Sequence, residues 1–247
     1  MTEVSDVWPE PVEGAPLTAR AAAELALAAA VREVSDFARS MVPTGSVRDR
    51  YDGLLIADAR QLTALAGRAL AAAVVVERTD GTPWPAVAQA TGEDPRAVRA
   101  RWEPAVERWE TAAEQAAIPV AADDADDPPV ATEAVIAELD AWVVRHREPH
   151  DPATGEHPVS AALGRMDPLH ELLHLAAVRR RLAALHDGTS PPEQLLPLVQ
   201  READVQEHLA ATADAADRQD HERAAARART MAAHLRARTD GEDLPAG

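Results

Sequence analysis

The sequence predicts an all-α protein, and three features of its 247 residues indicate this fold class. Hydrophobic residues make up 46% of the chain but aromatic residues only 3%, so the core must come from closely packed helices. Alanine, which has the highest helix propensity, is the most frequent residue type. Runs of β-branched residues, which favour strands, are scarce. We therefore expect helices throughout.

Apolar residues recur at helical spacing, and proline, glycine and aspartate mark where each helix begins or ends. In the first predicted helix, for example, Leu27, Val31 and Val34 lie on one face and Pro43 follows its end. Pro104 either starts a new helix or kinks the one before it. The expected helices cover residues 18–41 and 52–78, two short helices within 83–102, a helical stretch that runs on to 117, a helix from 132, and residues 168–186, 191–213 and 216–238.

Segments rich in proline, glycine and aspartate divide the chain into domains. Residues 1–16 are expected to form a disordered lead, and residues 241–247 a disordered tail. The run AADDADDPPVA ends at residue 131 and predicts an acidic linker over 119–131. On this basis we expect a helical domain at 17–118 and an antiparallel helical bundle at 132–240, interrupted by a polar loop at 147–160.

Composition limits the class of function. The 25 basic residues, all arginine, face 42 acidic ones, and the net charge of -17 disfavours anionic membranes. The absence of cysteine excludes disulfides, thiolate metal sites and cysteine nucleophiles. The first ten residues lack the pattern of a secretory signal, and the longest apolar stretch, Leu70–Val76, is far shorter than the roughly 20 residues of a membrane span. We therefore expect a cytoplasmic protein without a membrane partner.

The most specific stretch is Pro83–Trp102, PWPAVAQATGEDPRAVRARW, which predicts two short helices joined by a tight turn. Thr82 is placed to cap the first helix. Val87 and Ala88 form the aliphatic-then-small pair that a close crossing of two helices requires. Gly92, four residues later, suits a turn with positive φ.

The second helix of this stretch also has a clear start. Asp94 precedes Pro95, and an acceptor side chain before a proline is a strong signal for a helix N-terminus. Val98 and Trp102, four residues apart, give the helix an apolar inner face. Upstream, Gly81 is placed to end the preceding helix in a left-handed conformation.

Residues 83–102 resemble the helix-turn-helix of small bacterial regulators and of sigma-factor-like DNA-binding domains, in which a tryptophan opens the first helix and an Arg-aromatic pair closes the second. Trp84 and Arg101-Trp102 stand at those places. The resemblance implies a transcriptional regulator that binds double-stranded DNA, with Arg96 and Arg99 as the contacts. It implies these groove-facing positions: Asp94, Pro95, Arg96, Arg99, Ala100 and Glu103.

Local charge qualifies this hypothesis, because DNA affinity depends largely on basic side chains. Between residues 81 and 109 four arginines are matched by four acidic residues. We therefore expect a homodimer, in which the C-terminal bundle dimerises or senses a partner and two copies of the motif bind together. The alternative is a helical interaction or scaffold protein that binds no DNA, in which the motif is only a helical corner.

A second alternative comes from the segment HELLH, which matches the H-E-x-x-H pattern of zinc peptidases. His170 and His174 would be ligands one helical turn apart, and Glu171 would activate the zinc-bound water. Glu193, nineteen residues after His174, could supply a third ligand.

The context of HELLH favours a structural role. Pro168 starts the helix and places His170 in its first turn, whereas zinc peptidases carry these ligands inside a longer helix. The run Ser190–Glu193 has the pattern of a capping box, which accounts for Glu193. The remaining histidines in and near the loop are His146, His150 and His157, and their spacing imposes no metal-coordination geometry. We expect neither a cofactor nor a bound metal.

Overall fold

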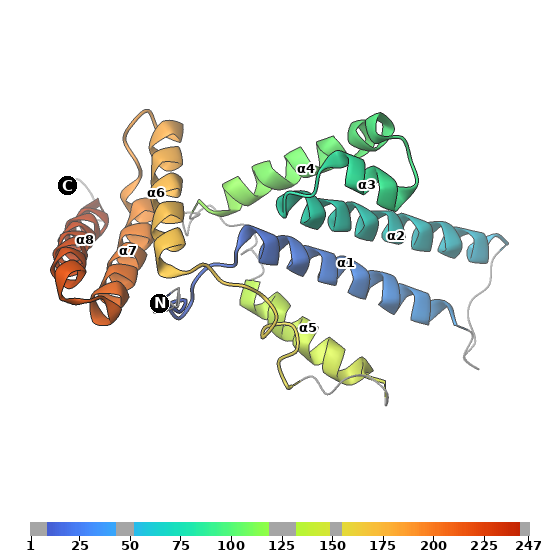
Figure 1. The fold of residues 1–247 in the computed structure, drawn as a ribbon, viewed down its shortest axis with the longest axis horizontal. Helices are drawn as coiled ribbons and strands as arrows, with labels where there is room; N and C mark the ends of the chain where they lie inside the picture. Colours follow the sequence, from blue (N-terminus) through green and yellow to red (C-terminus); the bar gives the residue numbers. More distant parts are fainter. Residues whose placement is uncertain (1–8, 43–51, 119–131, 149–154, 243–247) are drawn as a thin grey trace, which may run out of the picture. The chain divides into compact units, whose positions relative to one another are not determined.

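The computed structural model describes residues 9–42, 52–118, 132–148 and 155–242, and over these residues it is all-α (Figure 1). The described chain forms eight helices and no strand, which confirms the predicted fold class. The helices are α1 (Ala19–Met41), α2 (Leu54–Thr79), α3 (Trp84–Thr91), α4 (Pro95–Ala116), α5 (Thr132–His146), α6 (Pro168–Leu185), α7 (Pro192–Thr212) and α8 (Ala215–Glu242).

The chain divides into two compact units. The first, called here the α1–α5 unit, comprises Leu17–Thr111 and Pro129–Gly164. The second, the α6–α8 unit, comprises Met1–Pro16, Ala112–Pro128 and Arg165–Gly247. In these units α5 belongs with α1 to α4, whereas the sequence suggested a division at the linker 119–131. That linker lies outside the described residues, so the expected domains at 17–118 and 132–240 stay a prediction.

In the α1–α5 unit, α1 and α2 lie side by side in opposite directions (Figure 1). Thr18 caps α1 as an acceptor for the amide of Ala21, at 3.1 Å, where the sequence predicts the helix to start. The main apolar cluster of the unit lies at the end of this pair where α1 begins and α2 ends. Its buried members come from α1 to α4: Ala23, Val74, Val75, Val87, Ala88, Val98, Trp102 and Val106.

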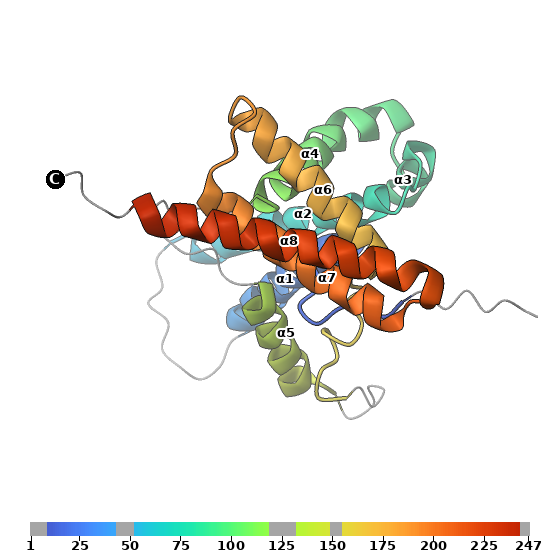
Figure 2. The same ribbon diagram turned by 90° about the vertical axis from the view of Figure 1, so that its left-hand side faces the viewer.

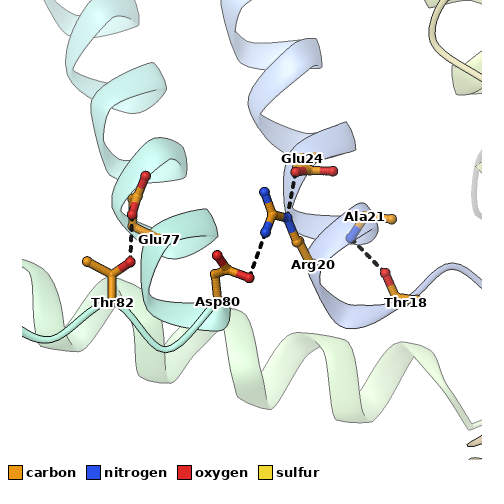
Figure 3. A network of polar contacts seen from close by, with 7 residues as sticks. All are labelled: Thr18, Arg20, Ala21, Glu24, Glu77, Asp80 and Thr82. Carbon is orange, nitrogen blue, oxygen red and sulfur yellow. Dashed lines mark hydrogen bonds and ion pairs between the residues drawn. The ribbon is translucent and has the colours of Figure 1, made fainter. Parts of the chain in front are cut away.

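The connection from α2 to α3 is closed by local hydrogen bonds. Gly81 has φ +85°, a left-handed conformation that glycine adopts without strain, and α2 ends there as predicted. The expected capping of α3 by Thr82 is wrong. Its hydroxyl lies 2.7 Å from a carboxylate oxygen of Glu77 instead, and Pro83 occupies the N-cap position without a side-chain bond (Figure 3).

An arginine joins the start of α1 to the end of α2. The guanidinium of Arg20 donates to Glu24 on its own helix at 2.9 Å and to Asp80 at 2.7 Å (Figure 3). Arg78, in the last turn of α2, donates to the carbonyl of Thr82 and lies over the ring of Trp84, 4.7 Å from its centroid. These contacts fix the direction in which the chain enters α3.

Helix α5 packs against α1. Ile136 and Leu139 are buried with Leu25, and the indole N–H of Trp142 donates to Asp36 at 2.9 Å. The same helix anchors the end of the segment that follows it. Buried Asp140 accepts hydrogen bonds from the amide of Val159 at 2.6 Å and from the amide and hydroxyl of Ser160 at 3.1 and 2.8 Å.

The α6–α8 unit is built on α7. Helix α8 runs along α7 over most of its length, and α6 contacts another side of α7 (Figure 2). Alanine lets α7 and α8 approach closely: the buried residues between them are Val199, Ala203, Ala228, Ala232 and Leu235. A second cluster joins α6 to α7 through Leu175, Val178, Leu182 and Leu198.

The N-terminal segment differs from the expected disordered lead over its described part, residues 9–16. Ala15 is fully buried, and its carbonyl accepts from Arg165 at 2.7 Å. The carbonyl of Glu13 accepts from Arg201 at 2.7 Å, and Pro16 accepts from the amide of Met166 at 2.9 Å. Arg165 and Arg201 therefore hold this segment on the α6–α8 unit by donating hydrogen bonds to its main-chain carbonyls. Residues 1–8 and 243–247 lie outside the described chain.

One described helix is long and apolar enough to cross a membrane by length and composition alone, namely α2. The apolar run around Leu70–Val76 of α2 is short, but further alanines before it make a longer part of the helix apolar on average. Core helices of proteins that never enter a membrane meet the same criterion.

Candidate nucleic-acid interface

The turn between α3 and α4 has the geometry that the sequence predicts. It comprises residues 92–94, and Gly92 has φ +72°. The amide of Glu93 donates to the carbonyl of Ala88 at 3.2 Å, which closes the end of α3. Asp94 then caps α4, since its carboxylate accepts from the amides of Arg96 and Ala97 at 2.9 and 3.3 Å.

The inner faces of the two helices are closely packed. Val87 and Ala88 are buried on α3, and Val98 on α4 has no exposed surface. Trp102 is also buried, with the guanidinium of Arg101 4.7 Å from its ring centroid. The inner positions expected from the sequence are therefore in the core.

The outer face of α4 presents the predicted groove-facing residues to solvent. Of these, Asp94, Pro95, Arg96, Arg99 and Ala100 are exposed, and Glu103 is half-buried. Within the described chain the guanidinium of Arg96 makes no hydrogen bond or ion pair with another residue. It is thus available to a ligand in solution.

Arg99 is not equally available. Its guanidinium donates to Glu103, one turn along α4, with Nε and Nη2 at 2.8 and 2.7 Å from Oε1. This hydrogen bond and the attraction between the charges raise the pKa of Arg99, and the same bond holds the pKa of Glu103 below its usual value. Because both side chains reach solvent, the ion pair is weak and a phosphate or base edge can replace the carboxylate at little cost.

Neighbouring charges reduce the basic character of this surface further. Arg101 donates to Glu93 at 3.2 Å, across the turn. The sequence left open whether Pro104 starts a new helix; it lies inside α4, which continues to Ala116, so Trp102 and Val106 line one buried face. The candidate surface is accordingly the exposed first two turns of a long helix.

The HELLH segment lies on α6, and its glutamate is committed elsewhere. Glu171 has no exposed surface, and both its oxygens accept from Arg201 of α7, Oε1 from Nε at 2.5 Å and Oε2 from Nη2 at 3.1 Å. A carboxylate held in this way has no access to a metal-bound water. The sequence analysis did not find that Arg201 pairs with Glu171, because the two residues are 30 positions apart and no local pattern links them.

The other residues of the proposed zinc site are not assembled. His170 is exposed and bonds Asp167, the N-cap of α6. His174 is half-buried, and burial lowers its pKa despite the nearby charge of Glu171. Over the described residues no three histidine or acidic side chains are grouped as a metal site.

Two further expectations concern Glu193 and the loop histidines. The predicted capping box at Ser190–Glu193 is not formed, because α7 begins at Pro192 and its N-cap residue, Pro191, makes no side-chain hydrogen bond. His146 bonds the carbonyl of Trp142 at 2.9 Å, and its ring lies tilted against the Trp142 ring with centroids 4.6 Å apart. His157 is largely exposed, 3.7 Å from Asp140. His150 lies outside the described residues.

Comparisons of the chain with protein-family models, with curated proteins and with solved structures found no match.

Proposed function

We propose that the protein binds double-stranded DNA through α3 and α4 and acts as a transcriptional regulator, with α4 entering the major groove. The observation that carries the proposal is the division of α4 into two faces. Val98 and Trp102 are buried, while the first two turns present Arg96, Arg99 and Ala100 to solvent beyond a glycine turn. A three-residue turn and a second helix exposed at its N-terminal end are typical of helix-turn-helix domains.

The residue types on this face suit base recognition. Arginine donates two parallel hydrogen bonds to O6 and N7 of guanine, and Arg96 and Arg99 lie one turn apart near the start of α4. Ala100 is small enough to let the helix approach a thymine methyl group.

The net charge of -17 opposes DNA binding by a single copy, since counterion release needs many basic contacts. We therefore propose a homodimer that places two α4 helices in successive major grooves, about 34 Å apart. Light scattering of the full chain, alone and with duplex, measures the stoichiometry. A one-to-one complex with a short duplex would contradict the dimer.

The test of DNA binding is a fluorescence-anisotropy titration of the full chain against a duplex selected from genomic fragments. Arg99→Ala and Arg96→Ala are expected to lose about 1 to 3 kcal/mol, or roughly 5- to 150-fold in affinity, if each contacts a base. Arg68→Ala is the matched control, because Arg68 is an exposed, ion-paired arginine on α2 of the same unit. Equal affinity of all three variants and the wild type would overturn the proposal.

A second function, binding of a protein partner without DNA, is favoured by one observation. The exposed large apolar side chains on α1 and α2 are Val31, Leu55, Ile56 and Leu70. Leu55 and Ile56, at the start of α2, expose 69% and 70% of their surface. Exposed apolar surface often marks protein contacts. A stoichiometric partner that co-purifies with the wild type but not with Leu55→Ser/Ile56→Ser, together with no duplex binding, would favour this function.

A further inference from the structure

The middle of α8 is basic in an otherwise acidic protein, whereas both ends of the helix carry acidic residues. Between residues 223 and 239 the sequence has no aspartate or glutamate, while the chain as a whole carries a net charge of -17. The five arginines in this stretch are Arg223, Arg227, Arg229, Arg236 and Arg238.

Part of this charge lies in a row along one face of α8. Ala228, Ala232 and Leu235 pack on α7, and the opposite part of α8 is not covered by another described helix of its unit (Figure 2). On one flank of α8, beside the buried face, Arg227, Met231, His234 and Arg238 follow one another at i, i+4, i+7 and i+11, so all four point to one side. All are exposed. We call these four residues the α8 basic face.

The cations of this face are available to a ligand. Among the side chains that the structure describes, which exclude those of residues 240–247, neither Arg227 nor Arg238 has a hydrogen-bond or ion-pair partner for its guanidinium. Arg229, on a different side of α8, shows the contrast: it donates to Glu207 at 2.8 Å and Asp204 at 2.7 Å, and these bonds raise its pKa. Over the described side chains, the two arginines of the exposed row are therefore not paired with a carboxylate, unlike Arg229.

We infer that the α8 basic face binds the sugar–phosphate backbone of nucleic acid. Guanidinium groups bind phosphate oxygens with two parallel hydrogen bonds. The row from Arg227 to Arg238 is about 16 Å long at 1.5 Å per residue, long enough to follow successive phosphates. Ala226 and Thr230, which line a shallow hollow together with Met231, are small and permit close approach of a backbone.

An anionic membrane surface fits this face less well. Amphipathic helices that bind membranes insert a broad apolar face, but the apolar face of α8 is already packed on α7. Met231 is the one large apolar side chain that remains exposed on the described part of α8. The inference deepens and rests on the proposed function, because a basic face on α8 would add phosphate contacts to a DNA-binding surface on which Arg99 and Arg101 are ion-paired.

The experiment measures duplex affinity of the full chain at several salt concentrations. Arg227→Ala/Arg238→Ala is expected to weaken binding to all sequences alike and to reduce the salt slope by about two. The matched control is Arg218→Ala/Arg229→Ala, which removes the same charge from α8 but takes arginines already bonded to Ala213, Asp204 and Glu207. Far-ultraviolet dichroism checks that all variants fold.

Each outcome decides between the two proposals. A reduced slope in Arg227→Ala/Arg238→Ala with unchanged affinity in both Arg96→Ala and Arg99→Ala supports the α8 basic face and overturns binding by α4. A slope equal to that of the wild type, or an equal loss in the control, overturns the α8 basic face even if Arg99→Ala weakens binding. Wild-type binding to phosphatidylserine vesicles but to no duplex overturns both and assigns the face to a membrane.

Discussion

Replacing Arg201 with alanine is expected to destabilise the α6–α8 unit strongly. Glu171 has no exposed surface and accepts two hydrogen bonds from Arg201, whose third nitrogen donates to the carbonyl of Glu13. The substitution leaves a buried carboxylate without a partner and releases the N-terminal segment. Both effects act on the same unit.

The magnitude follows from burial. Removing one partner of a buried ion pair costs about 3 to 5 kcal/mol, and the lost bond to the main chain adds about 1 kcal/mol. Arg229→Ala, also on the α6–α8 unit, is the matched control. Arg229 pairs with Asp204 and Glu207, but all three side chains are about half exposed, so its loss is expected to cost less than about 1 kcal/mol.

The assay is hydrogen exchange of peptides from α6 and α7 together with urea unfolding followed by far-ultraviolet dichroism, because the described part of this unit contains no tryptophan. In Arg201→Ala, Glu171→Gln is expected to recover part of the loss by removing the buried charge. If Arg201→Ala costs no more than Arg229→Ala, or if Glu171→Gln brings no recovery, the ion pair does not have the role assigned to it.

Three further predictions concern single side chains. Asp94→Ala removes both cap bonds of α4 and is expected to cost about 1 kcal/mol in urea unfolding followed by tryptophan fluorescence; an unchanged midpoint would contradict the cap. Burial raises the pKa of Asp140, but hydrogen bonds from Ser160 and Val159 outweigh it and leave the pKa below its usual value. Ionised Asp140 therefore stabilises the fold fully above about pH 4, and this stabilisation is lost as the pH falls further. The unfolding free energy of Asp140→Asn should accordingly depend less on pH in this range than that of the wild type, and an equal pH dependence would contradict the role given to Asp140. Finally, elemental analysis should find no stoichiometric zinc, and zinc that is lost in His174→Ala would restore the peptidase hypothesis.

Much of the fold could be predicted because its signals are local. Gly81 and Gly92 take the left-handed conformations that the sequence suggests, and Thr18 and Asp94 cap the helices that they precede. In α4 the buried face followed from the spacing of Val98 and Trp102, but in α1 the expected face was wrong, because Val31 is exposed and Ala21, Ala23 and Leu25 are buried instead. Thr82 was assigned wrongly because its hydroxyl had two possible partners, and Glu77, a turn earlier, competes with the helix amides.

What the sequence did not reveal depends on residues far apart in the chain. The pairing of Glu171 with Arg201 and the path of residues 9–16 across the α6–α8 unit have no local pattern. The same holds for α5, whose Ile136 packs against Leu25 of α1. The α8 basic face, in contrast, has a visible signal: Arg227, Met231, His234 and Arg238 are spaced at helical intervals in a stretch without acidic residues.

The central claim, that α4 reads base edges, is tested most directly by selecting duplexes from a randomised library with the full chain and with Arg99→Ala. The account predicts that the wild type enriches a two-fold symmetric motif containing guanine, and that Arg99→Ala loses the preference at one position in each half-site. The Arg68→Ala control should enrich the wild-type motif. Enrichment of no motif by the wild type, or of an identical motif by Arg99→Ala, would contradict the claim.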